Sequence, residues 1–102
     1  MIFVMATIEV AAGKRDAFLA EFRRIVPKVH AEAGCLEYLP TLDLDTRIPA
    51  QPDPRPNVVT VVEKWESVAA LEAHLIAPHM LEYREKVKEL VTQVTIQVLE
   101  PA

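Results

Sequence analysis

An α+β sandwich of the ferredoxin-like type, with the element order βαββαβ, is the fold that the sequence predicts. Apolar residues alternate with a period of two over residues 2–10 and again over residues 92–99, which indicates a strand at each end of the chain. Stretches with helical spacing follow residues 14 and 67, and two more extended segments lie between them. With this order, right-handed crossovers place both helices on one face of the sheet.

The first strand, residues 2–10, is largely apolar on both faces. A helix is predicted from Lys14 to Gly34, where glycine is the usual C-terminal cap. Pro27 removes one backbone hydrogen bond inside it, so we expect a bend there. The helix is indicated by an amphipathic stripe of apolar residues: Phe18, Phe22, Ile25, Val26, Val29 and Ala33.

The second strand, residues 35–45, is expected at an edge of the sheet, because Pro40 interrupts its alternation and cannot donate to a ladder. Four of the eight prolines fall between Thr46 and Asn57, which predicts a loop within the domain. Residues 58–65 carry valines on both faces, as expected of a central strand.

Ser67 is expected to cap the next helix, in which Val68, Leu71 and Leu75 recur at helical spacing. Pro78 interrupts this helix and suits the first turn of a second helical piece, set at an angle to the first. The chain then closes with the strand over residues 92–99.

The composition limits the classes of function. A length of 102 residues predicts one domain, residues 1–102, and 51% hydrophobic residues are enough for a core without disulfides or a structural metal. A net charge of -4 argues against nucleic acid and anionic membranes as partners. With only two glycines, the chain has neither a G-x-G-x-x-G motif nor a phosphate loop.

A cytoplasmic location is predicted. The single Cys35 cannot form an internal disulfide, and the first ten residues lack the basic start and cleavage site of a signal peptide. No apolar run approaches the roughly 20 residues that span a bilayer.

The sheet is expected to need a partner. Helices would cover only one of its faces, yet the strands over residues 2–10 and 58–65 are apolar on both. A homodimer formed through the open faces is the simplest way to cover the other.

Three blocks of sequence carry a resemblance to a known family. They are Glu32-Ala-Gly-Cys-Leu-Glu-Tyr38, then Glu63-Lys-Trp-Glu-Ser67, then Ala70-Leu-Glu-Ala-His74 with Pro78-His-Met80. In this order and spacing the chain resembles the antibiotic biosynthesis monooxygenase (ABM) domain family, including its quinol monooxygenase-like members.

The resemblance implies a dimer of ferredoxin-like subunits whose facing sheets form an α+β barrel, with a pocket between sheet and helices. It also implies oxidation of a small hydroxylated aromatic or quinol-type substrate by dioxygen, without metal or flavin. No cofactor is therefore expected.

Haem-degrading members of the same superfamily use an Asn on the first strand, a Trp early in the second helix and a ligating His ten residues later. The matching positions here carry Thr7, His74 and Arg84. Without the ligating His, haem degradation is disfavoured. Thr7 and Arg84 remain as candidates for substrate binding.

His74 is the candidate general base. Oxygenation without a cofactor requires a base that converts the substrate into an electron-rich anion. An unperturbed imidazole has a pKa of about 6.5, which suits proton transfer in both directions. His74 follows Leu71 by three residues and so lies near the core-facing stripe. Alternatively, its side chain bonds a backbone carbonyl at the break before Pro78.

Glu63 and Trp65 lie two residues apart on one strand and share a face, so the carboxylate could orient His74 while the indole forms a pocket wall. Alternatively, Trp65 is part of the core and Glu63 forms an ion pair with a neighbouring Lys or Arg. Tyr38 either donates its hydroxyl to a substrate oxygen or only packs on the sheet. Glu32, near a helix end, suggests a specific tertiary partner.

No metal site is predicted. The chain contains no H-x-x-x-H or C-x-x-C motif, and His79 lies five residues from His74, about 140° around an ideal helix. Cys35 is interpreted as a small, buried apolar residue and not as a reactive thiol.

Two functions from different classes stay open at this point. The first is a cofactor-independent monooxygenase that uses His74 and Glu63 for catalysis. The second is a non-catalytic dimer that binds a small apolar metabolite, or an isomerase that uses the same pocket.

Overall fold

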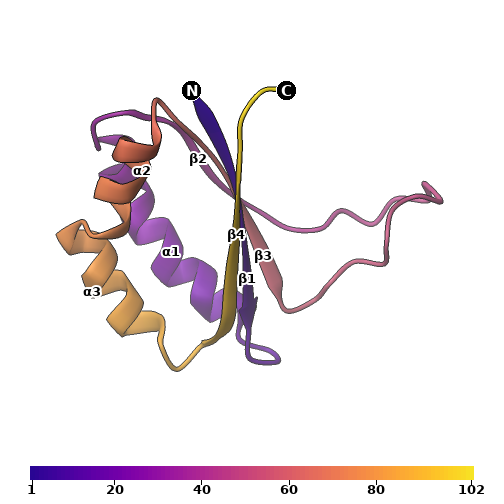
Figure 1. The fold of residues 1–102 in the computed structure, drawn as a ribbon. Coiled ribbons are helices and arrows are strands. Elements are labelled where there is room, and N and C mark those ends of the chain that lie inside the picture. Colours follow the sequence, from indigo (N-terminus) through magenta and orange to yellow (C-terminus); the bar gives the residue numbers. More distant parts are fainter.

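The computed structural model describes residues 1–102 and confirms the predicted α+β fold (Figure 1). Four antiparallel strands form one sheet in the order β2-β3-β1-β4. The elements are β1 (Ile2–Val10), α1 (Arg15–His30), β2 (Cys35–Thr41), β3 (Val58–Trp65), α2 (Val68–Leu75), α3 (Pro78–Val87) and β4 (Val91–Leu99).

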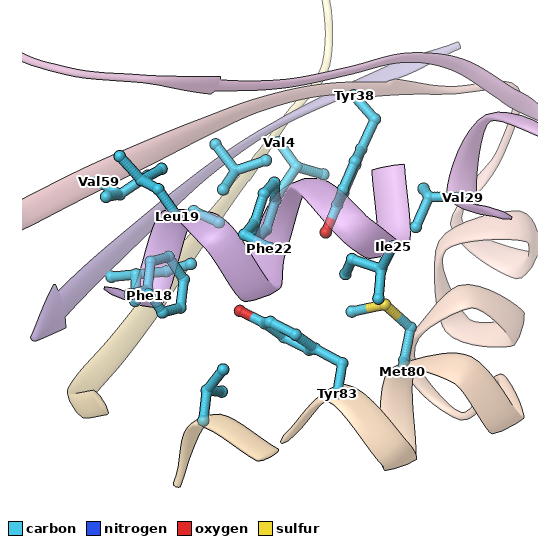
Figure 2. Close-up of a cluster of buried hydrophobic side chains, with 14 of the residues drawn as sticks. Val4, Phe18, Leu19, Phe22, Ile25, Val29, Tyr38, Val59, Met80 and Tyr83 are labelled. Carbon is cyan, nitrogen blue, oxygen red and sulfur yellow. The ribbon is translucent and has the colours of Figure 1, made fainter. Parts of the chain in front are cut away.

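All three helices lie on the same face of the sheet, as Figure 1 shows with the sheet seen on edge. The core fills the space between these two layers, where Phe18 and Phe22 of α1 pack below Val4 and Val59 of the sheet (Figure 2). None of the helices is both long and apolar enough to span a membrane.

Helix α1 ends at His30, four residues earlier than predicted. Ala33 is exposed, so the apolar stripe does not continue, and residues 31–34 form a turn. Gly34 closes this turn with a φ of +84°, and a Cβ there would lie 2.6 Å from Cβ of Ala70. Glycine thus ends the turn and not the helix, because it combines the left-handed backbone with a close approach to α2.

Strand β2 lies at an edge, as Pro40 predicted, but it ends at Thr41 and not at Asp45. The hydroxyl of Thr41 donates to the carbonyl of Thr60 at 2.6 Å, and the chain then leaves the sheet. Residues 42–57 form a long connection that Figure 1 shows projecting on the side opposite to the helices.

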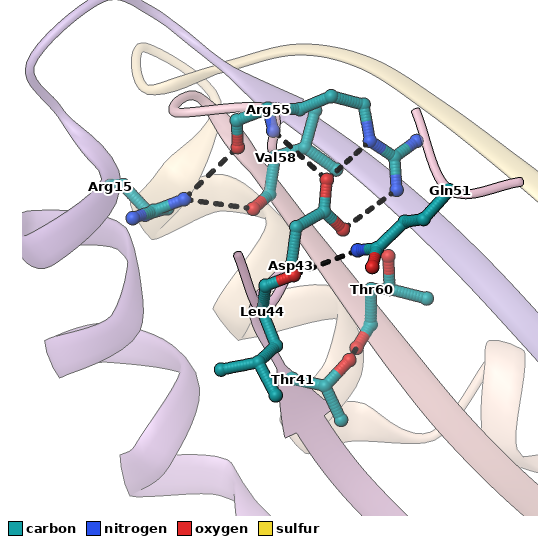
Figure 3. Close-up of polar contacts among 8 residues, drawn as sticks. All are labelled: Arg15, Thr41, Asp43, Leu44, Gln51, Arg55, Val58 and Thr60. Carbon is teal, nitrogen blue, oxygen red and sulfur yellow. Dashed lines mark hydrogen bonds and ion pairs between the residues drawn. The ribbon is translucent and has the colours of Figure 1, made fainter. Parts of the chain in front are cut away.

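This connection has its own polar contacts (Figure 3). The Arg55 guanidinium donates to both carboxylate oxygens of Asp43, at 2.8 and 3.0 Å, and its backbone N–H donates to the same carboxylate. These hydrogen bonds hold the pKa of Asp43 at about 2. Arg15 of α1 donates to the carbonyls of Arg55 and Val58, which ties the loop to the first helix.

The helical region after β3 is broken as predicted. The Ser67 hydroxyl accepts from the backbone N–H of Ala70 and caps α2. Pro78 occupies the first turn of α3, where a missing N–H costs no hydrogen bond.

The two faces of the sheet differ in cover. The even-numbered residues of β1 are buried under the helices, whereas Phe3, Met5 and Thr7 face the other way. On that open face Met5, Val62 and Leu39 are paired across three strands, and the Lys64 amine lies 5.5 Å from the Phe3 ring centre. The apolar open face matches the sequence-based expectation.

Candidate functional site

A cavity of about 470 Å³ lies between the sheet and helices α2 and α3. Twelve of its 16 lining residues are hydrophobic. This volume is typical of sites for small molecules, which are mostly apolar and carry a few polar groups. The other four lining residues are Glu63, His74, Arg84 and Lys88, and two of the twelve, Tyr38 and Tyr83, carry hydroxyl groups.

His74 lies in the last turn of α2 with a side chain that is 2% exposed. Its Nδ1 is 2.8 Å from Oε2 of Glu32, in the turn after α1. The partner predicted for this imidazole, Glu63 or a backbone carbonyl, is therefore wrong. The His74 ring does not bond a backbone carbonyl at the helix break, because the Glu32 carboxylate reaches its Nδ1 from the turn that Gly34 closes.

Burial lowers the pKa of His74, because the imidazolium loses its hydration in the core. The Glu32 carboxylate opposes this shift through its hydrogen bond and its charge. His74 is consequently neutral at pH 7 and can accept a proton.

Glu63 lies on β3 and is 5% exposed. Its Oε1 accepts from Nε1 of Trp65 at 2.9 Å, so the two residues share a face as expected, but they bond each other. Burial raises the pKa of Glu63 to about 7; the Trp65 hydrogen bond opposes the rise, and the charge of Glu32 adds to it. The raised pKa lets Glu63 exchange a proton near neutral pH.

Trp65 is fully buried in the core and does not line the cavity itself. It acts on two groups that do, since its ring lies 4.7 Å from the His74 ring and its N–H binds Glu63. The indole therefore does not form a pocket wall, and the alternative, that Trp65 is part of the core, is the correct one.

Tyr38 lies on β2 with its ring stacked on Phe22 at 5.4 Å and edge-on to His74 at 5.3 Å. Figure 2 shows Tyr38 entering the space between the layers from the sheet and Tyr83 entering it from α3. Burial raises the pKa of both hydroxyls, so they stay protonated and can donate. Tyr83 was not among the site residues predicted from the sequence, although its spacing from Met80 and Val87 placed it on the same face of the helix as these two residues.

Arg84 and Thr7, the two substrate-binding candidates taken from the haem-degrading pattern, lie on opposite faces of the sheet. Arg84 lines the cavity from α3. Thr7 faces away from it, between Thr60 and Thr95 on the open side of the sheet. Odd-numbered residues of β1 point away from the helices, so a substrate in this cavity has no access to Thr7.

No group of three or more His, Cys, Asp or Glu side chains is arranged to hold a metal ion. His74 and His79 do meet, but at the Glu32 carboxylate. Cys35 is half-buried and packs against the core, and burial raises the pKa of its thiol. This agrees with a packing role.

The chain matches the model of the antibiotic biosynthesis monooxygenase family over residues 1–86. It is 41% identical over 103 residues to the probable quinol monooxygenase YgiN of Escherichia coli K12, covering 99% of this chain and 98% of that protein. Among solved structures, PA3566 of Pseudomonas aeruginosa is 30% identical with a TM-score of 0.81, covering 99% and 93%. Rv0793 of Mycobacterium tuberculosis is 28% identical with a TM-score of 0.79, covering 99% and 94%.

Proposed function

Because this chain belongs to the antibiotic biosynthesis monooxygenase family, we propose that it is a cofactor-independent monooxygenase acting on a small hydroxylated aromatic or quinol-type substrate. The observation that supports this most is the pair formed by His74 and Glu63. Both line one apolar cavity, and burial shifts the pKa of one down and of the other up, to about 7. Buried groups with opposite pKa shifts in one cavity are typical of a catalytic base and acid.

The reaction begins with a proton transfer. Nδ1 of His74 is engaged by Glu32, so Nε2 remains to take the hydroxyl proton of the substrate. The substrate anion passes one electron to dioxygen, and the resulting radical pair forms a C–O bond. Most of the cavity wall is apolar, and the Tyr38 and Tyr83 hydroxyls can donate to a negatively charged substrate oxygen.

The second half needs an acid. Glu63 protonates the distal oxygen and the O–O bond breaks as the ring carbon loses its hydrogen and becomes a carbonyl. The released hydroxide takes this ring proton and leaves as water, and the proton that His74 took from the substrate then restores Glu63. One oxygen atom stays in the product, and the substrate supplies all four electrons. Arg84 at the cavity wall can bind a further substrate oxygen.

Oxygen uptake tests the proposal. Chelator-treated protein is assayed against a panel of quinols and phenols, and ¹⁸O₂ is used to trace the oxygen in the product. We expect uptake with one labelled atom in the product and kcat about 10²- to 10⁴-fold lower in His74→Ala. The variant Leu81→Glu, at an exposed position on α3, is the control. Saturable binding without uptake by any compound would contradict an oxygenase and favour a binding protein.

A homodimer formed through the open sheet face is part of the proposal, since Met5, Val62 and Leu39 form an apolar row there. Val62→Glu should give a monomer in analytical ultracentrifugation, whereas Leu81→Glu on the helical side should not. A wild-type monomer at micromolar concentration would contradict the dimer.

A cytoplasmic location also belongs to the proposal, because the lone Cys35 forms no internal disulfide.

A further inference from the structure

Three titratable side chains meet at one carboxylate oxygen beside the cavity. Oε2 of Glu32 lies 2.8 Å from Nδ1 of His74 and 2.8 Å from Nε2 of His79. The His74, Glu32 and His79 side chains are 2%, 13% and 18% exposed, so the cluster runs from the cavity wall toward the surface. The proposed reaction uses only the first of them.

The break between α2 and α3 makes this meeting possible. On one continuous helix, residues five apart point about 140° away from each other. Here α2 ends at Leu75 and α3 begins at Pro78, so His74 and His79 belong to two helices of different direction. The turn after α1 supplies Glu32 between them.

A carboxylate can only accept hydrogen bonds. The ring nitrogens that face Glu32 must therefore carry hydrogen, which makes His74, a cavity-lining residue, the Nδ1–H tautomer and leaves a lone pair on its Nε2. When Nε2 takes a proton, the imidazolium is buried, and an unpaired buried charge is costly. The Glu32 carboxylate supplies the opposite charge at hydrogen-bond distance.

We infer that Glu32 is the positioning residue of His74, and that His79 holds Glu32 in place by donating a second hydrogen bond to the same oxygen. Glu32 sets the tautomer of the base and stabilises its charged form. His79 contributes a hydrogen-bond donor. The inference rests on the proposed function for its effect on turnover, but not for the tautomer.

Charged groups surround both imidazoles, and each variant used below changes only one of these groups. His74 faces Glu32, His79 and Arg84. His79 borders a small surface groove between α1 and α3, whose charged members are Glu21, Arg24, Lys28, Glu82 and Lys86.

Nitrogen-15 NMR of the histidine rings in the resting protein tests the positioning directly. The wild type should show His74 with a protonated Nδ1 and an unprotonated Nε2. His79→Gln keeps a side-chain N–H donor and should preserve this signature, whereas His79→Leu and Glu32→Gln should give mixed tautomers. An Nε2–H tautomer in the wild type, or an unchanged signature in His79→Leu and Glu32→Gln, would overturn the inference.

Kinetics supply the second measurement. We expect kcat to fall about 10²-fold in Glu32→Gln and about 10-fold in His79→Leu with KM little changed, and to stay near normal in His79→Gln. Without the carboxylate, the imidazolium of His74 is less stable, so the acid limb of kcat/KM should move to lower pH in Glu32→Gln. The control Glu82→Gln, in the same groove, should leave kcat within about twofold.

If His79→Gln loses as much activity as His79→Leu, a titrating imidazole is required and the donor role is wrong. If wild-type protein turns over none of the substrates, the proposed function fails, while the NMR signature still decides whether Glu32 and His79 position His74. The thermal midpoint of each variant shows whether it folds. If Glu32→Gln does not fold, the comparison of His79→Gln with His79→Leu still tests the inference.

Discussion

The carboxyl groups of Glu63 and Asp43 show how location decides the behaviour of one chemical group. Glu63 lies under the helices with a single indole donor, and burial raises its pKa to about 7. Asp43 lies in the projecting loop with three hydrogen bonds from Arg55, and its pKa falls to about 2. A cation that stays in reach of water keeps a carboxylate charged, whereas an apolar cavity with one neutral donor raises the pKa of a carboxyl toward neutral pH. Only the second can exchange a proton at neutral pH.

Replacing Glu63 should have the largest effect. Glu63→Gln keeps the shape and can still hydrogen bond, but it cannot deliver a proton, so kcat should fall by about 10²- to 10⁴-fold. Asp43→Asn is the matched control, because it makes the same chemical change on the carboxyl in the loop. Steady-state oxygen uptake measures both. Equal activity of the two variants would remove Glu63 from the reaction.

The pH dependence of stability should separate the two carboxyls by sign. The folded protein holds the Glu63 proton from pH 4.5, its ordinary pKa, to about pH 7, whereas the unfolded chain releases it. Stability should therefore fall by up to about 3 kcal/mol as pH rises through this window, since one pKa unit corresponds to about 1.4 kcal/mol. Urea unfolding at several pH values measures this slope, and Glu63→Gln should flatten it. An equal slope in that variant would contradict the raised pKa.

Asp43 works in the opposite direction. Its pKa is lowered, so its contribution is present above pH 3.8 and is lost as pH falls toward about 2.

Trp65→Phe sharpens the comparison by removing the only donor to Glu63. The pKa of Glu63 should then rise above 7, because the Trp65 hydrogen bond favours the charged form. The alkaline limb of the kcat/KM profile should move to higher pH, and the protein should lose about 1–3 kcal/mol of stability. A profile that does not move would show that another group sets this limb.

The smallest effect is expected in the loop. Asp43→Asn weakens the contact with Arg55, whose side chain is half exposed, so stability should change by about 1 kcal/mol or less. Thermal unfolding at low and high salt measures this, and the loss should shrink at high salt. A loss of several kcal/mol would mean that the loop is a structural part of the domain core.

Residues 42–57 and the cavity also differ in how well the sequence predicted them. Four prolines between Thr46 and Asn57 leave too few backbone N–H donors for a helix or a sheet ladder, so the loop was predictable. Pro40 placed β2 at the edge because it cannot donate to a ladder. The contact between Asp43 and Arg55 in the loop was not predictable, because it joins residues 12 apart in a segment without periodicity.

The order of strands and helices, the Ser67 cap and the helix break at Pro78 followed from the sequence, since periodicity and capping act over a few neighbouring residues. His74, Glu63 and Tyr38, chosen from the sequence, and Arg84, chosen from the family resemblance, all line one cavity, and their roles there stay predictions. Thr7 was misplaced because a positional match to another pattern overrode the alternation of its own strand, in which odd residues face away from the helices.

What only the tertiary structure decided is which of these groups bind each other. Glu32 reaches His74 across 42 residues of chain and His79 across 47, and Trp65 takes Glu63 as its acceptor. Hydrogen bonds of this kind depend on how the turn after α1 packs against two helices of different direction, and no local pattern encodes that packing. The pKa of Glu63 is likewise a property of the folded cavity, because the desolvation that raises it does not exist until the helices cover the sheet.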